Sequence, residues 1–395
     1  MRNLIRWGVA VVVVLHGLIH LLGAAKGLGW ADVSELKEPI SPVMGAVWLG
    51  VGALVVLAGI LLPMRFRWWS MVGVLAAVAS QVVIVTSWDD AKAGTIVNLI
   101  LLVAAAMSFA AHGPSSYRAE YRRRAHTVLA TQPPSGLVTE ADLAHLPEPV
   151  ATYVRRSGAV GLPPVTDFRA RVHGRIRAGK DKPWMRFTGE QVNTYGPDPA
   201  RLFFIDATMS GIPIDVLHVY IAGTATMRVK LCSLVPMVSA AGPEMDRSET
   251  VTVFNDLCLL APAALISAPI TWQRIEANRV RGTFTNGTQQ VTADLVFDTE
   301  GNLVDFISDD RARASQDGTS FTWQRWSTPA PEFSTMVARR LCTRGEAWWH
   351  APDPVGPYPY IEISVDEISY NTSIAEPAPS LGTRGAVLDD AAQLG

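Results

Sequence analysis

The clearest pattern in the chain is a series of four long stretches without formal charge in its first third. They cover residues 7–25, 39–64, 68–88 and 93–116, and short polar segments separate them. A helix needs roughly 20 apolar residues to cross a hydrocarbon core about 30 Å thick, and each stretch reaches that length. Four in succession are too many for buried helices of one soluble domain. The pattern predicts a region of four transmembrane helices over residues 1–112.

Charges in the connecting segments predict which side of the membrane the termini occupy. Basic residues precede the first stretch, separate the second from the third and follow the fourth: Arg2, Arg6, Arg65, Arg67, Arg118, Arg122, Arg123 and Arg124. The other two connections are acidic or mixed. Cytoplasmic loops carry the excess of Lys and Arg, so both termini and the soluble part are predicted to be cytoplasmic. A cleaved signal peptide is the alternative for the first stretch, and it leaves this side unchanged.

Few polar residues interrupt these stretches. His16 and His20 lie four residues apart on one face of the first predicted helix, Gln81 lies in the third and Asn98 in the fourth. Ionisable groups inside a membrane are costly and suggest a function. One interpretation is haem or metal ligation by the histidine pair. The other, which we favour because no facing histidine is available, is hydrogen bonding to Gln81, Asn98 or backbone carbonyls within the bundle.

A basic segment and linker, residues 113–138, precede a soluble domain over residues 139–372. Its first part is predicted as a helix in two pieces, broken at Pro147 and Pro149. From residue 164 apolar and polar residues alternate, which indicates antiparallel strands with one buried face. The predicted strands are 167–177, 184–192, 202–209, 214–221, 225–231, 280–285, 288–297, 303–307, 321–326 and 360–370. Residues 373–395 are predicted to be a disordered tail.

One apolar helix interrupts the predicted strands. Asp246 and Glu249 have the spacing of a capping box, and Val251, Phe254 and Leu257 follow. The segment is apolar on more than one face, so it should be buried. The fold class is therefore a four-helix membrane region followed by a mainly antiparallel β domain. We expect that domain to be a curved sheet or half-barrel with one or two helices, one of them across its concave side.

Composition and motifs exclude several classes of function. The net charge is −2, which gives no electrostatic argument for binding nucleic acid. Three isolated cysteines argue against a disulfide framework. The scattered histidines and cysteines form no metal signature, and no phosphate-binding glycine loop is present. The sequence predicts no cofactor and no metal; the partners are the lipid bilayer and a possible hydrophobic ligand, with the oligomeric state left open.

Four segments of the soluble part resemble an uncharacterised bacterial family whose members carry a β-rich domain, often behind membrane helices. They are Leu146-Pro-Glu-Pro-Val150, Phe187-Thr-Gly-Glu-Gln191, the run from Gly242 to Leu265, and Glu367-Ile-Ser-Tyr-Asn371. The resemblance covers residues 146–371 and implies no catalytic residue. The order of elements is also similar to the periplasmic lipoprotein-carrier fold, an open half-barrel with a helical lid over an apolar cavity. The predicted cytoplasmic side departs from that location.

These observations favour a non-enzymatic membrane protein whose β domain binds an apolar or lipid-like ligand. The residues expected to line the cavity are Phe204, Val216, His218, Val253, Phe254, Leu257, Leu260 and Trp272. A second expectation concerns Arg169, Arg171, Arg175 and Arg177, which alternate with apolar residues on one strand. Two interpretations are open: these arginines bind anionic headgroups, or they pair with acidic residues on neighbouring strands.

Two alternatives remain open. One is an enzyme acting on a membrane-derived substrate, for which Glu190, Asp206, His218 and Asp310 are the polar residues available. That alternative requires the four side chains to converge in one cleft. The other is a structural or regulatory membrane partner, which requires a filled interior.

Overall fold

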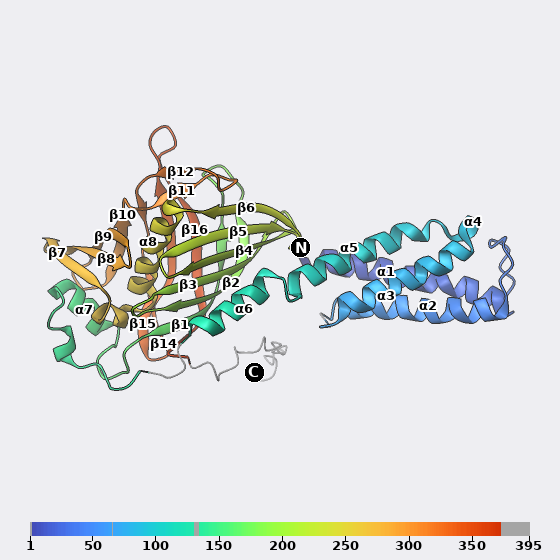
Figure 1. The fold of residues 1–395 in the computed structure, drawn as a ribbon, viewed down its shortest axis with the longest axis horizontal. Helices are drawn as coiled ribbons and strands as arrows, with labels where there is room; N and C mark the ends of the chain where they lie inside the picture. The colour runs from blue at the N-terminus through green and yellow to red at the C-terminus, as the bar shows by residue number, and fades with distance from the viewer. Residues whose placement is uncertain (1, 65, 130–133, 373–395) are drawn as a thin grey trace, which may run out of the picture.

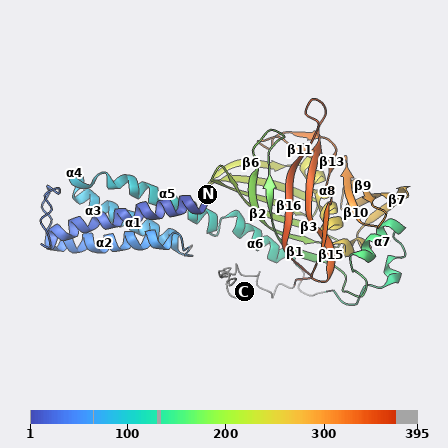
Figure 2. The ribbon, with the colours of Figure 1, turned by 180° about the vertical axis from the view of Figure 1, so that it is seen from behind.

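The computed structural model describes residues 2–64, 66–129 and 134–372, and these form a helical bundle and a β domain placed end to end (Figure 1). The predicted tail, residues 373–395, lies outside the described residues. Four helices of the bundle are long and apolar enough to cross a membrane, judged by length and composition. Figure 2 shows the same arrangement from behind, with the bundle at one end and the sheet at the other.

The bundle is built from α1 (Arg2–Gly27), α2 (Pro42–Leu61), α3 (Trp69–Thr86) and α5 (Gly94–His112), with the short α4 (Trp88–Ala91) between the last two. Glycines allow α1 and α2 to approach closely. A Cβ atom on Gly17 would lie 2.7 Å from Val56 Cγ2, and one on Gly52 would lie 2.9 Å from the Gly17 carbonyl oxygen. Small residues at such contacts are typical of helices that pack inside membranes.

The basic segment after the bundle forms a further helix, α6 (Tyr117–Val128), which the Ser116 hydroxyl caps by accepting from the Ala119 N–H at 3.1 Å. This helix packs on the outer face of the sheet. Tyr121 and Leu129 are buried there against Leu202 and Leu217 of the strands beneath. The segment therefore attaches the β domain to the end of α5 through a packed contact.

The β domain contains a sheet of fourteen strands in the described residues, and every pairing in it is antiparallel. The strand order is β6-β5-β4-β3-β2-β1-β16-β15-β13-β10-β9-β8-β7, with β14 also paired to β15. The first strands are β1 (Asp167–Ile176), β2 (Met185–Thr194), β3 (Ala200–Met209), β4 (Ile212–Ile221), β5 (Thr224–Leu231) and β6 (Val235–Ala241). The remaining ones are β7 (Ile270–Glu276), β8 (Arg279–Asn286), β9 (Gln289–Phe297), β10 (Leu303–Ser308), β13 (Trp326–Ser327), β14 (Glu332–Met336), β15 (Arg339–His350) and β16 (Pro357–Tyr370).

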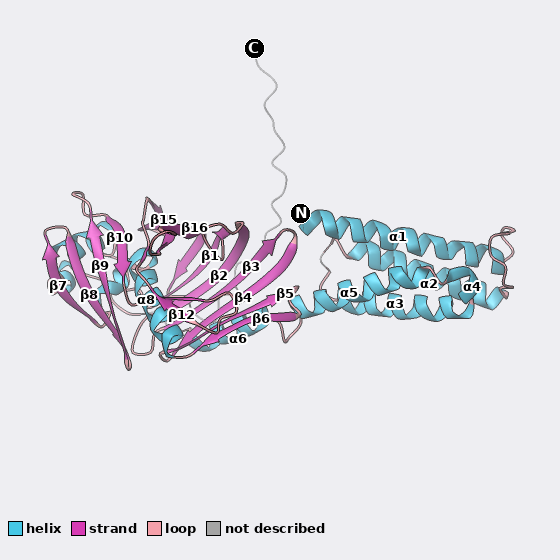
Figure 3. Ribbon diagram, turned by 90° about the horizontal axis from the view of Figure 1, so that it is seen from above, coloured by secondary structure: helices cyan, strands magenta, loops and turns pink. Residues whose placement is uncertain are grey.

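The buried helix of the domain is α8 (Pro243–Leu260), and the sheet curves around it (Figure 3). It contacts β4, β5 and β6 on one side and β9, β10 and β15 on the other. The predicted capping box is wrong. The helix begins at Pro243, after Gly242 with a φ of 105°, and Asp246 instead accepts from the Ala225 N–H at 2.6 Å. Glu249, the second member of that box, is buried.

Smaller elements complete the domain. The predicted two-part helix is present as η1 (Glu140–Leu143) and α7 (Glu148–Arg156), and η2 (Pro262–Ile266) follows α8. A separate hairpin of β11 (Ala312–Ala314) and β12 (Phe321–Trp323) lies beyond the main sheet. The large antiparallel sheet is thus confirmed. The alternation pattern missed β6, β7, β11, β14 and β15 as strands.

Candidate functional site

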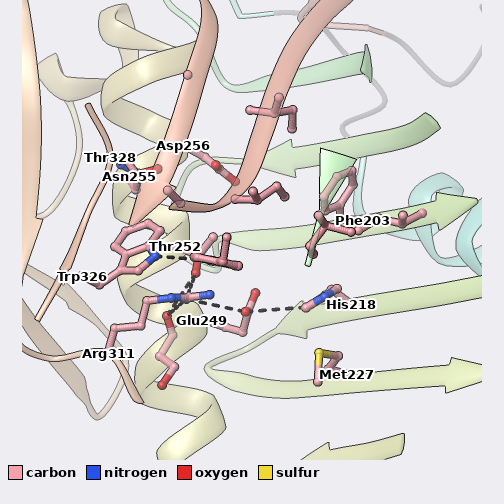
Figure 4. A pocket seen from close by; sticks show the side chains of 18 of the residues that line it. Phe203, His218, Met227, Glu249, Thr252, Asn255, Asp256, Arg311, Trp326 and Thr328 are labelled. Carbon is pink, nitrogen blue, oxygen red and sulfur yellow. Dashed lines mark hydrogen bonds and ion pairs between the residues drawn. The ribbon is translucent and has the colours of Figure 1, made fainter. Parts of the chain in front are cut away.

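A pocket of about 360 Å³ lies between the concave face of the sheet and α8. Side chains from β1, β3, β4, β5, β15 and β16 form its sheet wall, and α8 forms the opposite wall. The first strand of the separate hairpin, with Arg311 before it, completes the enclosure. In Figure 4, Phe203 and Met227 lie on one side of this space and Trp326 on the other.

Much of the pocket wall is apolar because the inward positions of several strands are hydrophobic. On β3 the inward residues Phe203 and Ile205 are buried. They belong to a wall that also contains Val172, Met227, Leu259, Leu260, Trp349, Ile363 and Val365. Such a surface suits hydrocarbon.

The polar part of the pocket is a buried ion-pair network between β3 and α8. Arg201 Nη1 lies 3.0 Å from Glu249 Oε2, and Arg201 Nε lies 2.7 Å from Asp256 Oδ2. The amides of Gln191 and Asn193 also donate to Asp256 Oδ2, at 2.7 and 3.1 Å. A carboxylate buried in this way is stabilised by its paired guanidinium and amide donors.

Two further side chains lie close to Glu249. Its Oε1 atom lies 3.6 Å from His218 Nδ1 and 3.8 Å from Arg311 Nη1. Burial alone would favour the neutral acid, but the Arg201 guanidinium, followed by His218 and Arg311, holds the pKa of Glu249 well below its usual range. The two arginines and the two carboxylates of the network therefore balance in charge.

Arg311 is fixed by contacts on several sides. Its guanidinium lies 4.7 Å from the ring centre of Trp326 and 5.7 Å from that of Trp349. Its Nη1 donates to the Ser248 carbonyl at 2.8 Å and also to the Thr252 hydroxyl. Two buried nitrogens at the pocket, Arg311 Nε and His218 Nδ1, have no hydrogen-bond partner among the described residues.

Some of the residues predicted to line the cavity lie on the pocket wall, and others lie in the core. His218 and Leu260 lie on the pocket wall. Three residues of α8 are at most 1% exposed and pack in the main core rather than on the pocket: Val253, Phe254 and Leu257. Trp272 packs against the Phe254 ring at a centroid distance of 6.4 Å. Val216 shares the inner face of β4 with His218, but it packs against the core and does not line the pocket.

Phe204 requires a correction. It lies on the outer face of β3, where the Tyr121 ring is 6.4 Å away and the Arg118 guanidinium is 4.6 Å from its ring centre. Its neighbour Phe203 is the residue that faces the pocket. Both faces of β3 are buried, one by the pocket and one by α6, so both residues are apolar.

The four polar residues considered for acid–base chemistry do not converge. Glu190 forms an ion pair with Arg118 on the outer face, and Asp206 Oδ2 lies 3.6 Å from the same guanidinium. His218 lies on the inner face. Asp310 is bound by Arg247 at 2.6 Å and by the Thr292 N–H at 2.7 Å. Glu190 and Asp206 thus lie together on the outer face, while His218 and Asp310 lie elsewhere.

Two of the four arginines in the predicted row, Arg171 and Arg175, pair across to β16. Arg171 forms an ion pair with Glu367, and Arg175 Nη2 lies 2.5 Å from Glu362 Oε1. Arg169 belongs to the same row. Arg177 differs, because it lines the pocket and its guanidinium lies 4.5 Å from the ring centre of Trp184. These contacts match the cross-strand pairing alternative for Arg171 and Arg175.

The polar residues of the bundle form one hydrogen-bonded chain. His16 Nε2 lies 3.2 Å from both Ser80 Oγ and Asn98 Oδ1, and His20 Nε2 lies 3.0 Å from the same hydroxyl. Asn98 donates to the Gln81 carbonyl oxygen at 3.0 Å. Among the described residues, no group of three potential ligand side chains is arranged to hold a metal ion.

Sequence patterns missed the central residues of the pocket: Arg201, Glu249, Asp256, Arg311 and Trp326. One signal was available. Arg201 is a lone charge beside the apolar run from Leu202 to Ile205, and a charge in a buried strand needs a buried partner. No local pattern links it to Glu249, which lies 48 residues further along the chain.

Comparisons with known proteins place this domain in a family. The sequence model of DUF6544, described as a family of unknown function, matches residues 136–363, which is more than half of the chain. The resemblance to an uncharacterised family is thereby confirmed. No curated protein matches the chain.

Two solved structures show partial likeness to the fold. A DUF1329 family protein from Desulfovibrio piger has 10% identity and a TM-score of 0.34, covering 56% of this chain and 91% of its own. A LolA superfamily protein from Nitrosomonas europaea has 11% identity and a TM-score of 0.33, covering 59% and 94%. Likenesses of this extent say nothing about what this chain binds.

Proposed function

This chain belongs to DUF6544, a family of unknown function, and we propose that it is a membrane protein whose β domain binds an amphiphilic, lipid-like ligand. The observation that carries the proposal is the pocket beneath α8, with an apolar wall and a charge-balanced polar network. Its volume of about 360 Å³ is within the range of small-molecule sites, roughly 300–1,000 Å³.

The two kinds of surface in the pocket favour a ligand with an apolar and a polar part. Hydrocarbon would remove Phe203, Met227 and Ile363 from contact with water. A polar head would be bound beside His218 and Arg311, whose side chains line the pocket next to Glu249. A hydrogen bond from the Arg311 guanidinium to an ionised head would be stronger than one between neutral groups.

We further propose that α1, α2, α3 and α5 span the cytoplasmic membrane and that the β domain lies on the cytoplasmic side. The apolar length of the helices and the basic residues at one end of the bundle support this side. The β domain follows α5 directly, through α6. Because Glu190, Asp206, His218 and Asp310 do not share a cleft, we propose binding rather than a reaction.

Native mass spectrometry of the full-length protein, released from lipid nanodiscs, tests the binding proposal. We expect an added mass on the protein that solvent extraction identifies as a lipid or another amphiphile. A protein that stays at its unliganded mass after incubation with a lipid extract would contradict the proposal.

A matched pair of substitutions locates the ligand. Ile363 lines the pocket, so Ile363→Trp should fill it and abolish the added mass. Ile275 is 38% exposed on β7, outside the pocket, so Ile275→Trp should leave the added mass unchanged. Equal ligand occupancy in the two variants would place the bound molecule elsewhere.

A further inference from the structure

Two neighbouring hairpins of the β domain end in exposed apolar side chains. The β3–β4 turn carries Met209 and Ile212, which are 38% and 42% exposed. The β5–β6 turn and the start of β6 carry Leu234, Val235 and Met237, which are 44–55% exposed. Large hydrophobic residues at two adjacent tips form a group with no cover in the described residues, and such groups mark contact surfaces.

The tips lie at the end of the β domain that faces the helical bundle. Lys230 is the next-to-last residue of β5, and its Nζ lies 4.4 Å from the ring centre of Tyr117, the first residue of α6. Helix α5 ends at His112, a few residues before Tyr117. In Figures 1 and 3 the ends of both hairpins lie beside the start of α1 and the end of α5.

We propose that these hairpin tips, Met209, Ile212, Leu234, Val235 and Met237, insert into the surface of the lipid bilayer. The inference rests on the proposed function in one respect, because it requires the four helices to span that bilayer. The start of α1 and the end of α5 would then lie at the cytoplasmic surface of the bilayer, beside the tips. Apolar side chains are stabilised at the boundary between headgroups and acyl chains.

Positively charged residues lie beside the tips, and an anionic membrane surface attracts positive charge. Lys230 lies over the Tyr117 ring, across from Asp215 on β4, whose carboxylate accepts from the Ser233 hydroxyl. Arg122 and Arg123 lie on the neighbouring α6. Anionic headgroups of a cytoplasmic leaflet favour such residues by about 1 kcal/mol each.

The same hairpins also carry part of the pocket wall. His218 lies on β4 and Met227 on β5, in the strands whose tips reach the membrane in this proposal. Together with α6, the tips give the β domain two attachments to the membrane region. The pocket is then held against the bilayer, where its proposed amphiphilic ligand resides.

Spin labels on the full-length protein test the contact with lipid. Each label is attached to a single cysteine in a Cys232→Ser background, since Cys258 and Cys342 are buried. The protein is placed in vesicles of phosphatidylcholine and phosphatidylglycerol. Collisions of each label with oxygen, which dissolves in lipid, and with a water-soluble nickel chelate are compared by electron paramagnetic resonance.

Three positions separate the possible outcomes. The test label replaces Met237, the control for water replaces Ile275 on β7, and the control for the bilayer replaces Val82, which is 61% exposed on α3. We expect the oxygen-to-nickel ratio at position 237 to be several-fold higher than at 275 and lower than at 82. A label at Leu234 should repeat the result if Met237→Cys does not fold.

The outcomes also separate the two proposals. A lipid-exposed label at 82 with a water-exposed label at 237 overturns the tip proposal alone. Water-exposed labels at both 82 and 237 overturn the membrane-spanning proposal as well. Strong dipolar broadening between labels at 237 would place a second copy of the chain on the tips, and that too overturns contact with lipid.

Discussion

At the scale of single residues, Glu249 holds the polar network of the pocket together. It contacts Arg201, His218 and Arg311, and its side chain is only 3% exposed. Removing one member of a buried ion pair leaves the other charges without compensation, which typically costs about 3–5 kcal/mol. Glu249 therefore stabilises the contact of α8 with β3 and with Arg311.

We predict that Glu249→Gln lowers the free energy of unfolding by about 3 kcal/mol at neutral pH. The pKa of Glu249 is lowered in the folded protein, so its stabilising charge is present above the unfolded-state pKa, about 4.3, and is lost as the pH falls further. The difference between wild type and variant should therefore narrow in acid. Unfolding followed by tryptophan fluorescence measures it.

The exposed Glu276 provides the control for this substitution. Glu276→Gln should change the stability by less than about 0.5 kcal/mol at every pH. If the two variants lost the same stability, or if the effect of Glu249→Gln did not depend on pH in acid, the buried carboxylate would not be ionised in the folded protein.

Single residues also show which inward positions can be predicted from the sequence and which cannot. The prediction that His218 lies on the wall is supported by the structure, and it follows from the parity that His218 shares with Val216 on β4. The prediction for Phe204 is wrong because the whole run from Leu202 to Ile205 is apolar and does not show which residues face inward. A strand that is buried on both faces has no polar side from which the inward parity can be determined. The contact with α6 that buries its outer face is not visible in the sequence.

At the scale of elements, the contact between α6 and β3 tests whether Phe203 faces the pocket and Phe204 faces α6. Phe203 and Phe204 are consecutive residues on opposite faces of one strand, and both are nearly fully buried. Phe204→Ala removes the ring under Arg118 and Tyr121, so α6 should detach. Phe203→Ala opens the pocket and leaves α6 in place. Each change should cost about 3–5 kcal/mol.

Limited trypsin digestion distinguishes the two variants. We predict rapid cleavage within α6, after Arg122, Arg123 or Arg124, in Phe204→Ala alone. Phe203→Ala should resist cleavage there as wild type does, although it loses similar stability. Equal cleavage in both would mean that α6 responds to general destabilisation rather than to its own contact with the outer face.

Some helices and strands could be predicted from sequence patterns, and others could not. Uncharged stretches predicted α1, α2, α3 and α5, and alternation predicted β1 to β5. β15 was missed because two of its inward residues are Gly345 and Ala347, which are too small to produce a hydrophobic alternation. Both line the pocket, so the property that leaves room for a ligand also hides the strand. β6 was missed because its first residues are exposed.

At the scale of the whole molecule, the arrangement of bundle and sheet makes the orientation in the membrane testable. Val337 is 62% exposed in the turn between β14 and β15, and Trp30 is 64% exposed after α1, at the opposite end of the bundle from α6. If the β domain is cytoplasmic, these two positions lie on opposite sides of the membrane. The basic ends of the helices predict that Val337 is inside.

We predict opposite labelling of Val337→Cys and Trp30→Cys, each in the Cys232→Ser background, in bacterial spheroplasts. A membrane-impermeant maleimide should react with Trp30→Cys in intact spheroplasts and with Val337→Cys only after they are disrupted. The reversed pattern would place the β domain outside. The pocket would then have access to lipids of the opposite leaflet, because the tips and α6 fix the sheet to whichever surface the end of α5 reaches.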